Sequence, residues 1–196
     1  MTEAPPRRGG LRRRTEEGTF DGPFTVAARW LLARGVHPNH FTFAQAPVFG
    51  FMIWSALEGH AWTFFALSWF VILLDGGDGI LARTGNLQSR AGAILDATFD
   101  TVGIAVVLFG AALFFPEYQW WMLALFVGNG LLFLQNALLE TKVVSYVRGP
   151  IIVAVAWPQA IHGSLFAACF TVAWLLLARA RLTLRRLFAT NATGSP

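Results

Sequence analysis

The chain has 196 residues, of which 55% are hydrophobic and only 13% are charged, and its mean hydropathy is +0.53. A soluble domain carries about 25% charged residues, so this composition excludes a disordered chain and argues against a soluble globule. The net charge is +4, but the basic residues lie at the ends of apolar segments, which indicates membrane topology and contact with anionic lipid headgroups rather than nucleic acid. The single cysteine, Cys169, excludes an internal disulfide and a cysteine-based metal site.

The N-terminal part divides into a polar segment and a short amphipathic one. Residues 1–22 contain five clustered arginines but no apolar stretch with a cleavage site, which predicts a basic cytoplasmic arm rather than a signal peptide. Residues 23–36 begin with Pro23, which suits the first turn of a helix, and can carry Phe24 on an apolar side and Arg29 on a wet side. Because so short a helix cannot cross a hydrocarbon core of about 30 Å, we expect it to lie in the membrane interface.

Six long apolar runs follow, separated by short polar breaks. We predict membrane-spanning helices at residues 41–57, 61–81, 91–115, 118–139, 143–161 and 164–180. The fifth is the least regular, because Pro150 and Pro158 interrupt it. The sequence therefore predicts an all-α fold, an integral membrane bundle of six transmembrane helices. The interfacial helix precedes this domain, which covers residues 37–182, and a cytoplasmic tail at 183–196 follows it.

The distribution of basic residues predicts the orientation of the bundle. The breaks at residues 58–60, 116–117 and 162–163 contain no lysine or arginine, whereas the alternate loops and both ends hold all 15. By the positive-inside rule, both termini face the cytoplasm.

Four of the five aspartates fall within the second and third predicted spans. Asp75 and Asp78 are three residues apart, and Asp96 and Asp100 are four apart, so each pair projects from one helix face. An aspartate at the membrane centre costs about 2.5 to 3.5 kcal/mol, and these spans contain no comparable number of cations. Hard oxygen ligands without histidine or cysteine suit Mg²⁺ or Mn²⁺, and two carboxylate pairs suit two such ions.

These residues carry a resemblance to a known family. The chain is similar in this region to the CDP-alcohol phosphatidyltransferases, and it matches all eight positions of their signature, Asp75-x2-Asp78-Gly79-x2-Ala82-Arg83-x8-Gly92-x3-Asp96-x3-Asp100. Ahead of the first predicted span, Pro38, Asn39 and Thr42 resemble a weaker element of the same family. Six spans after an interfacial helix also resemble the family architecture.

The resemblance implies a reaction and a role for each matched residue. Members of the family displace CMP from a CDP-linked lipid, such as CDP-diacylglycerol, with the hydroxyl of a small alcohol or lipid acceptor. It implies that the four aspartates hold one or two Mg²⁺ or Mn²⁺ ions and that Asp100 is also the general base. Together with Asp75 and Asp78, the residues that would shape the CDP site are Gly79, Ala82, Arg83 and Gly92. Homodimers are common among relatives, and the active site would lie on the cytoplasmic side.

The acceptor is less well defined. Several relatives that use a phosphorylated acceptor have a basic residue directly after the last aspartate, where this chain has Thr101. This difference weakens the case that the chain is a phosphatidylglycerophosphate or phosphatidylinositol-phosphate synthase, without excluding it. Arg90, Lys142 and Arg148 are candidate contacts for an anionic acceptor, or simply topology determinants. Gln45, together with two polar residues of the fourth span, could line a cavity or bond between helices.

Two other classes of function compete with the transferase. A divalent-cation or proton-coupled transporter also buries acids in the membrane, but here the acids cluster towards one surface and the two halves show no inverted repeat. A catalytically dead scaffold is the third class, and the complete set of four aspartates argues against it.

Overall fold

The computed structural model describes residues 21–139 and 147–192, and these ranges contain helices and turns but no strand. The predicted all-α class is therefore confirmed for the described part of the chain. Its elements are α1 (Asp21–Ala33), α2 (Pro38–Leu57), α3 (Ala61–Thr84), α4 (Arg90–Phe114), the 3₁₀ turn η1 (Pro116–Tyr118), α5 (Gln119–Leu139), α6 (Arg148–Ala156), the 3₁₀ turn η2 (Pro158–Ala160) and α7 (Ile161–Ala192). Lys142 and residues 1–20 of the predicted arm at 1–22 lie outside the described residues.

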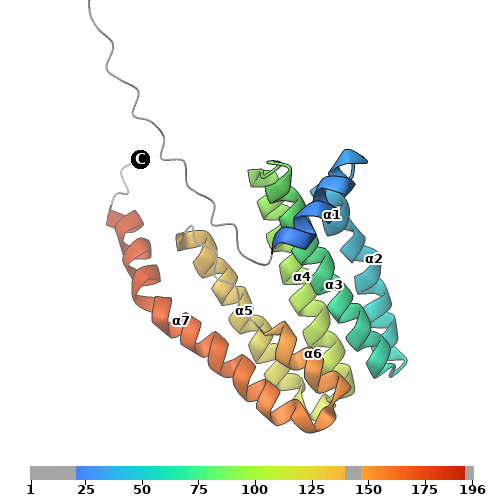
Figure 1. Cartoon of the computed structure of the whole chain (residues 1–196). Coiled ribbons are helices and arrows are strands. Elements are labelled where there is room, and N and C mark those ends of the chain that lie inside the picture. The colour runs from blue at the N-terminus through green and yellow to red at the C-terminus, as the bar shows by residue number, and fades with distance from the viewer. Residues whose placement is uncertain (1–20, 140–146, 193–196) are drawn as a thin grey trace, which may run out of the picture.

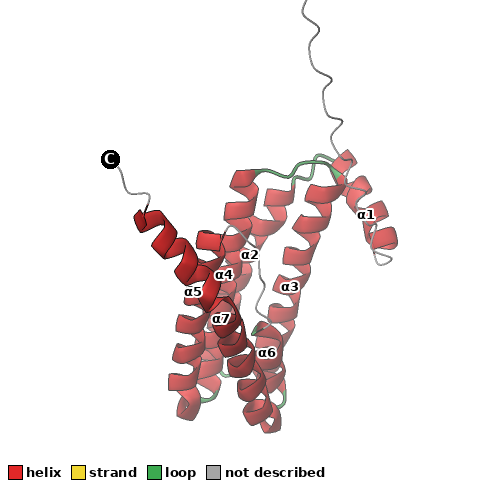
Figure 2. Cartoon of the chain, turned by 90° about the vertical axis from the view of Figure 1, so that its left-hand side faces the viewer, coloured by secondary structure: helices red, strands yellow, loops and turns green. Residues whose placement is uncertain are grey.

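The long helices form a bundle that opens at one end. Helices α2, α3 and α4 pack side by side, and α1 crosses one end of this group against α3 (Figure 1). Helix α7 packs against α5 and α6, and α6 also contacts α3 and α4, so that it joins the two parts of the bundle. Figure 2 shows α2, α3 and α4 running roughly along one direction, with α7 oblique to them and α1 inclined away at one end.

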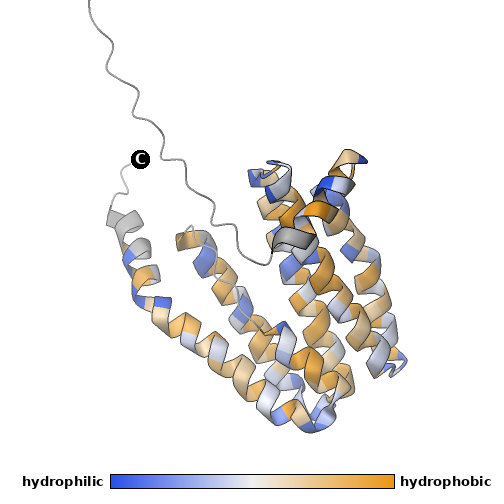
Figure 3. Cartoon of the chain, in the orientation of Figure 1, coloured by the Kyte–Doolittle hydropathy of each residue, from blue (hydrophilic) through white to orange (hydrophobic). Residues whose placement is uncertain are grey.

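Apolar side chains face both the interior and the outside of this bundle. Phe64, Met52 and Ile151 are among the largest fully buried side chains, yet Phe51, Leu73 and Phe166 are exposed on the surfaces of their helices. Figure 3 shows hydrophobic residues along the length of the helices and polar residues gathered near their ends. Helix α3, helix α4 and the stretch from Pro158 to Arg185 are each long and apolar enough to cross a membrane, which fits exposed apolar surfaces that face lipid.

Two helices in the bundle begin at side-chain caps. At the start of α2, Nδ1 of His37 accepts a 3.3 Å hydrogen bond from the Asn39 amide, and Nδ1 of His40 accepts one of 3.2 Å from the His37 amide. At the start of α4, the Ser89 hydroxyl accepts a 3.0 Å bond from the Gly92 amide. These caps satisfy amides that the first helical turn leaves without partners.

Close packing between α3 and α4 depends on a glycine. A Cβ atom at Gly110 of α4 would lie 2.3 Å from the ring of Phe64 on α3, a side chain that is 0% exposed. Only a residue without a side chain lets this ring pack against the backbone of α4.

The structure corrects several predicted boundaries. Helix α1 already begins at Asp21, inside the predicted arm. In the predicted fifth span at 143–161, the longest helix among the described residues is the nine-residue α6, which ends before Pro158 because proline cannot continue a helix, and the 3₁₀ turn η2 follows it. Helix α7 starts at Ile161 instead of residue 164, and it continues through the predicted tail to Ala192. The number of membrane crossings and the interfacial position of α1 stay predictions.

One arginine assigned to topology is inside the bundle. Arg179 of α7 is buried and donates a hydrogen bond to the side-chain oxygen of Asn136 on α5. This residue therefore contributes to the packing between α5 and α7, in addition to any effect on orientation.

Candidate functional site

The four aspartates lie on two neighbouring helices. Asp75 and Asp78 are near the C-terminal end of α3, and Asp96 and Asp100 are in the first half of α4. Carboxylate oxygens of Asp75, Asp96 and Asp100 all lie within 4.8 Å of one another, and all three side chains are half-buried. Because carboxylate oxygens are the ligands that hard divalent cations prefer, this trio could hold such an ion.

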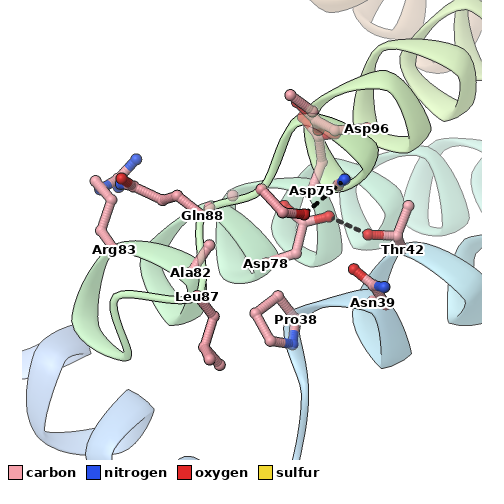
Figure 4. Close-up of a pocket in the computed structure, with 15 residues that line it drawn as sticks. Pro38, Asn39, Thr42, Asp75, Asp78, Ala82, Arg83, Leu87, Gln88 and Asp96 are labelled. Atoms are coloured by element: carbon pink, nitrogen blue, oxygen red, sulfur yellow. Dashed lines mark hydrogen bonds between the residues drawn. The ribbon is translucent and has the colours of Figure 1, made fainter.

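Asp78 lies beside this trio and has a separate partner. The Thr42 hydroxyl on α2 donates a 2.6 Å hydrogen bond to Asp78 Oδ2 (Figure 4), and Asp78 is only 6% exposed. A buried carboxylate is tolerated when it is hydrogen-bonded, and here α2 supplies the donor. The bond also fixes the position of α2 relative to α3.

A cavity of about 390 Å³ opens next to these carboxylates. The six residues assigned to the CDP site, Asp75, Asp78, Gly79, Ala82, Arg83 and Gly92, all line it. So do Asp96 and the three residues of the weaker element, Pro38, Asn39 and Thr42, as Figure 4 shows around the pocket. The structure therefore joins two sequence elements that lie more than thirty residues apart in one pocket.

Gly92 lies where α2 and α4 approach each other at the cavity wall. A Cβ atom at this position would be 3.1 Å from Ser89 Oγ and 4.0 Å from Asn39 Oδ1. Any larger residue would press on the Ser89 cap and narrow the space beside Asn39. A small residue at this position thus keeps both the helix cap and the cavity open.

Asp100 lies outside the residues that line the cavity and has an arginine partner. The Arg148 guanidinium, at the first residue of α6, donates a hydrogen bond to Asp100 Oδ1 as part of an ion pair. Nη1 of Arg148 is buried without a hydrogen-bond partner among the described residues, and it packs against Gly103 of α4. A candidate acceptor contact therefore lies directly beside the candidate base.

Of the other candidate acceptor contacts, the structure describes only Arg90. Arg90 is exposed at the first residue of α4 and does not line the cavity, and Lys142 lies outside the described residues. The Thr101 hydroxyl donates a 2.8 Å bond to the Ala97 carbonyl of its own helix. Of the two described candidates, Arg90 and Arg148, it is Arg148 that contacts one of the four aspartates.

The sequence left the role of one polar residue of α2, Gln45, open. Gln45 is 1% exposed, and neither of its side-chain polar atoms has a hydrogen-bond partner among the described residues. Its sequence signal was a glutamine three residues after Thr42 in an otherwise apolar stretch, and that pattern alone does not show what the side chain faces.

Comparisons with known proteins agree with these observations. The family model described as CDP-alcohol phosphatidyltransferase matches residues 35–194. The fold is similar to that of a Mycobacterium tuberculosis phosphatidylinositol phosphate synthase whose crystal structure has CDP-DAG bound, with a TM-score of 0.68 and 19% identity over 82% of this chain and 92% of that one. No curated protein matches the chain significantly by sequence. The family match covers most of the chain, including the whole pocket, and the chain belongs to the CDP-alcohol phosphatidyltransferase family.

Proposed function

We propose that this membrane protein transfers a phosphatidyl group from CDP-diacylglycerol, or a closely related CDP-linked lipid, to the hydroxyl of an acceptor alcohol and releases CMP. The observation that carries the proposal is the cavity, because its lining contains all six residues assigned to the CDP site, Asp75 and Asp78 among them, together with Asp96. The family match favours this reaction over a transporter.

The carboxylates suit a cofactor of one or two Mg²⁺ or Mn²⁺ ions. Asp75, Asp96 and Asp100 would hold an ion between them, and Asp78 with Thr42 extends the same donor set towards the cavity. When bound, the ions neutralise the negative charge of the diphosphate and hold it in place. Asn39, Gly79, Ala82, Arg83 and Gly92 then form the walls around the nucleotide, where small residues leave room and Arg83 adds a positive charge.

The chemical step needs a base on the side of the carboxylates opposite to the leaving CMP. In this proposal the acceptor oxygen attacks the phosphorus that carries the lipid, and Asp100 takes the proton of the attacking hydroxyl. The bond between that phosphorus and the bridging oxygen breaks, and CMP leaves with the bonding electron pair. Asp100 fits this task because it lies next to the other carboxylates but outside the cavity wall.

Arg148 is the residue best placed to meet the acceptor. It pairs with Asp100 and has a buried nitrogen without a partner among the described residues. A guanidinium in this place can orient an oxygen-rich acceptor beside the base. We expect Arg148→Gln to raise the KM for the acceptor more than the KM for the lipid donor.

Release of CMP tests the proposal directly. The purified chain in lipid nanodiscs is supplied with CDP-diacylglycerol, Mg²⁺ or Mn²⁺, and a panel of acceptors that contains glycerol phosphate, inositol phosphate, serine, a choline-type alcohol and a lipid hydroxyl. We expect acceptor-dependent CMP release with a matching phospholipid product. Absence of CMP release with every acceptor would contradict the proposal.

We also propose that the site and both chain termini face the cytoplasm and that α1 lies in the membrane interface. The support is the sequence distribution of basic residues together with the exposed apolar side chains of Phe24, Val26 and Trp30 on α1. An interfacial helix buries such side chains among lipid headgroups. Homodimer formation stays a prediction, which the mass of the complex in nanodiscs tests.

A further inference from the structure

Gln45 of α2 is the buried polar side chain that the proposed reaction does not yet use. Its exposed fraction is 1%, and within the described residues neither Nε2 nor Oε1 has a hydrogen-bond partner. Burying an amide without partners is unfavourable, and such groups are rare in folded proteins. The absence of a partner calls for a physical explanation.

The contacts of α2 show which residue of α3 lies at the same height along the bundle as Gln45. Thr42 bonds to Asp78, and the connection at residues 58–60 makes α2 and α3 antiparallel. Three residues further along α2 therefore correspond to three residues back along α3. This register places Gln45 at the level of Asp75.

The contacts with α4 give the same depth independently. Asn39 lies near Gly92, with 4.0 Å between Asn39 Oδ1 and the Cβ position of Gly92, and Phe49 lies 3.4 Å from the Cβ position of Gly103. The two helices therefore run parallel with nearly constant offset. Gln45 falls at the level of about residue 98 on α4, between Asp96 and Asp100.

The side chain points to the interior of the bundle. On α2, Thr42, Gln45 and Phe49 belong to the buried face, whereas the intervening Phe43 and Pro47 are exposed. Because α2 packs against both α3 and α4, the amide is enclosed between these helices at the depth of the carboxylate trio.

We propose that Gln45 is a positioning residue for the divalent-ion site. Its amide offers two N–H donors and one acceptor. The carboxylates of Asp75, Asp96 and Asp100 can accept from the donors, and the carbonyl can accept from water bound to an ion. Partners of this kind orient ligating carboxylates and are commonly required for full metal affinity. The inference rests on the metal-dependent reaction proposed above.

Gln45→Met tests this role, because methionine has similar length and shape but no amide. Binding of Mn²⁺ to the full chain in nanodiscs is measured by electron paramagnetic resonance of the free ion. We expect the Mn²⁺ Kd to rise about 10- to 100-fold. Gln135→Met is the matched control. The Gln135 side-chain oxygen on α5 is also buried and has no hydrogen-bond partner in the described part of the chain, yet α5 contributes no residue to the pocket. We expect its Kd to stay at the wild-type value.

Thermal unfolding without metal separates a positioning role from a structural one. Since the Gln45 amide has no partner among the described residues, its removal leaves no new unsatisfied group there. We expect the melting temperature of Gln45→Met without metal to equal or exceed that of the wild type. We expect the rise in melting temperature on addition of Mn²⁺ to require higher Mn²⁺ concentrations in Gln45→Met than in the wild type. CMP release should show the same shift in its Mn²⁺ midpoint, with a rate at saturating Mn²⁺ close to that of the wild type.

Two results would overturn the inference alone. One is a Gln45→Met variant that binds Mn²⁺ as tightly as the wild type. The other is a variant with a lower melting temperature in the absence of metal, since this would show a structural role. A wild-type chain that neither binds Mn²⁺ nor releases CMP would instead overturn the proposed function together with the inference.

Discussion

Thr42 and Asp78 are 36 residues apart, and the 2.6 Å hydrogen bond between them connects α2 to the carboxylates of α3. The threonine belongs to the weaker sequence element and the aspartate to the main signature. Their contact shows why both elements occur in one protein. The first helix of the bundle supplies a donor that the buried carboxylate would otherwise lack.

Thr42→Val removes this donor while it keeps the shape of the side chain. We expect a loss of about 1–3 kcal/mol in the free energy of unfolding, because Asp78 is left buried without its partner. CMP release is expected to fall about 10- to 100-fold, as for other groups that orient metal-ligating carboxylates. Thermal unfolding in detergent and the transfer assay measure the two effects.

Two variants serve as controls for this bond. Thr42→Ser keeps the hydroxyl and should retain most of the activity. Thr98→Val removes an exposed hydroxyl that donates to the Ile94 carbonyl of its own helix, so activity should be unchanged. Wild-type activity and stability in Thr42→Val would show that the bond has no role.

Asp100→Asn keeps the shape of the side chain but removes the base. We expect CMP release to fall by about 10²- to 10⁴-fold, the usual contribution of a general base. Glu117→Gln, in the turn between α4 and α5, removes a carboxylate far from the cavity and should leave the rate unchanged. Activity retained in Asp100→Asn would exclude this residue as the base.

Chelation should abolish the reaction. Since the trio offers only carboxylate oxygens, we expect EDTA to stop CMP release and added Mg²⁺ or Mn²⁺ to restore it. The measurement is the initial rate against free metal concentration. Turnover at an unchanged rate in excess EDTA would refute the metal requirement.

Gly110→Ala should destabilise the bundle through overpacking. The added methyl group would lie 2.3 Å from the buried ring of Phe64, and forced displacement of this kind typically costs about 1–3 kcal/mol. Gly130→Ala is the matched control, because no atom lies within 4 Å of its Cβ position. A melting temperature that falls in Gly130→Ala as much as in Gly110→Ala would contradict this packing argument.

The proposed orientation can be tested with single cysteines. The chain has one cysteine, so Cys169→Ala provides a background without thiols. In intact cells we expect an impermeant maleimide to label Glu58→Cys but not Gln88→Cys, and the reverse in inside-out vesicles. Labelling of Gln88→Cys from outside the cell would reverse the proposed topology.

The local features of the site could be predicted from the sequence. Helical spacing places the paired aspartates on single faces, and seven of the eight matched signature residues, all except Asp100, line one cavity. The Arg148–Asp100 ion pair was not predictable, because it joins residues 48 apart through the packing of α6 against α4. The missing partners of Gln45 likewise depend on how three helices enclose it.

The extent of α7 shows a different limit of sequence patterns. Arginines such as Arg181 and Arg185 correctly indicate where an apolar run ends, but arginine, leucine and alanine are all good helix formers. The helix therefore continues to Ala192 although the apolar run has ended. Hydropathy marks the end of the apolar surface, whereas backbone geometry decides where the helix stops.

The capping contacts between His37 and His40 have a consequence for the whole pocket. They determine the residue at which α2 begins, and each residue of an α-helix turns its direction by about 100°. Asn39 and Thr42, which line the pocket, lie in the first two turns that follow this cap. Loss of the cap would let this first part of α2 fray, so that damage to two histidines outside the pocket would disturb the pocket while every aspartate is intact.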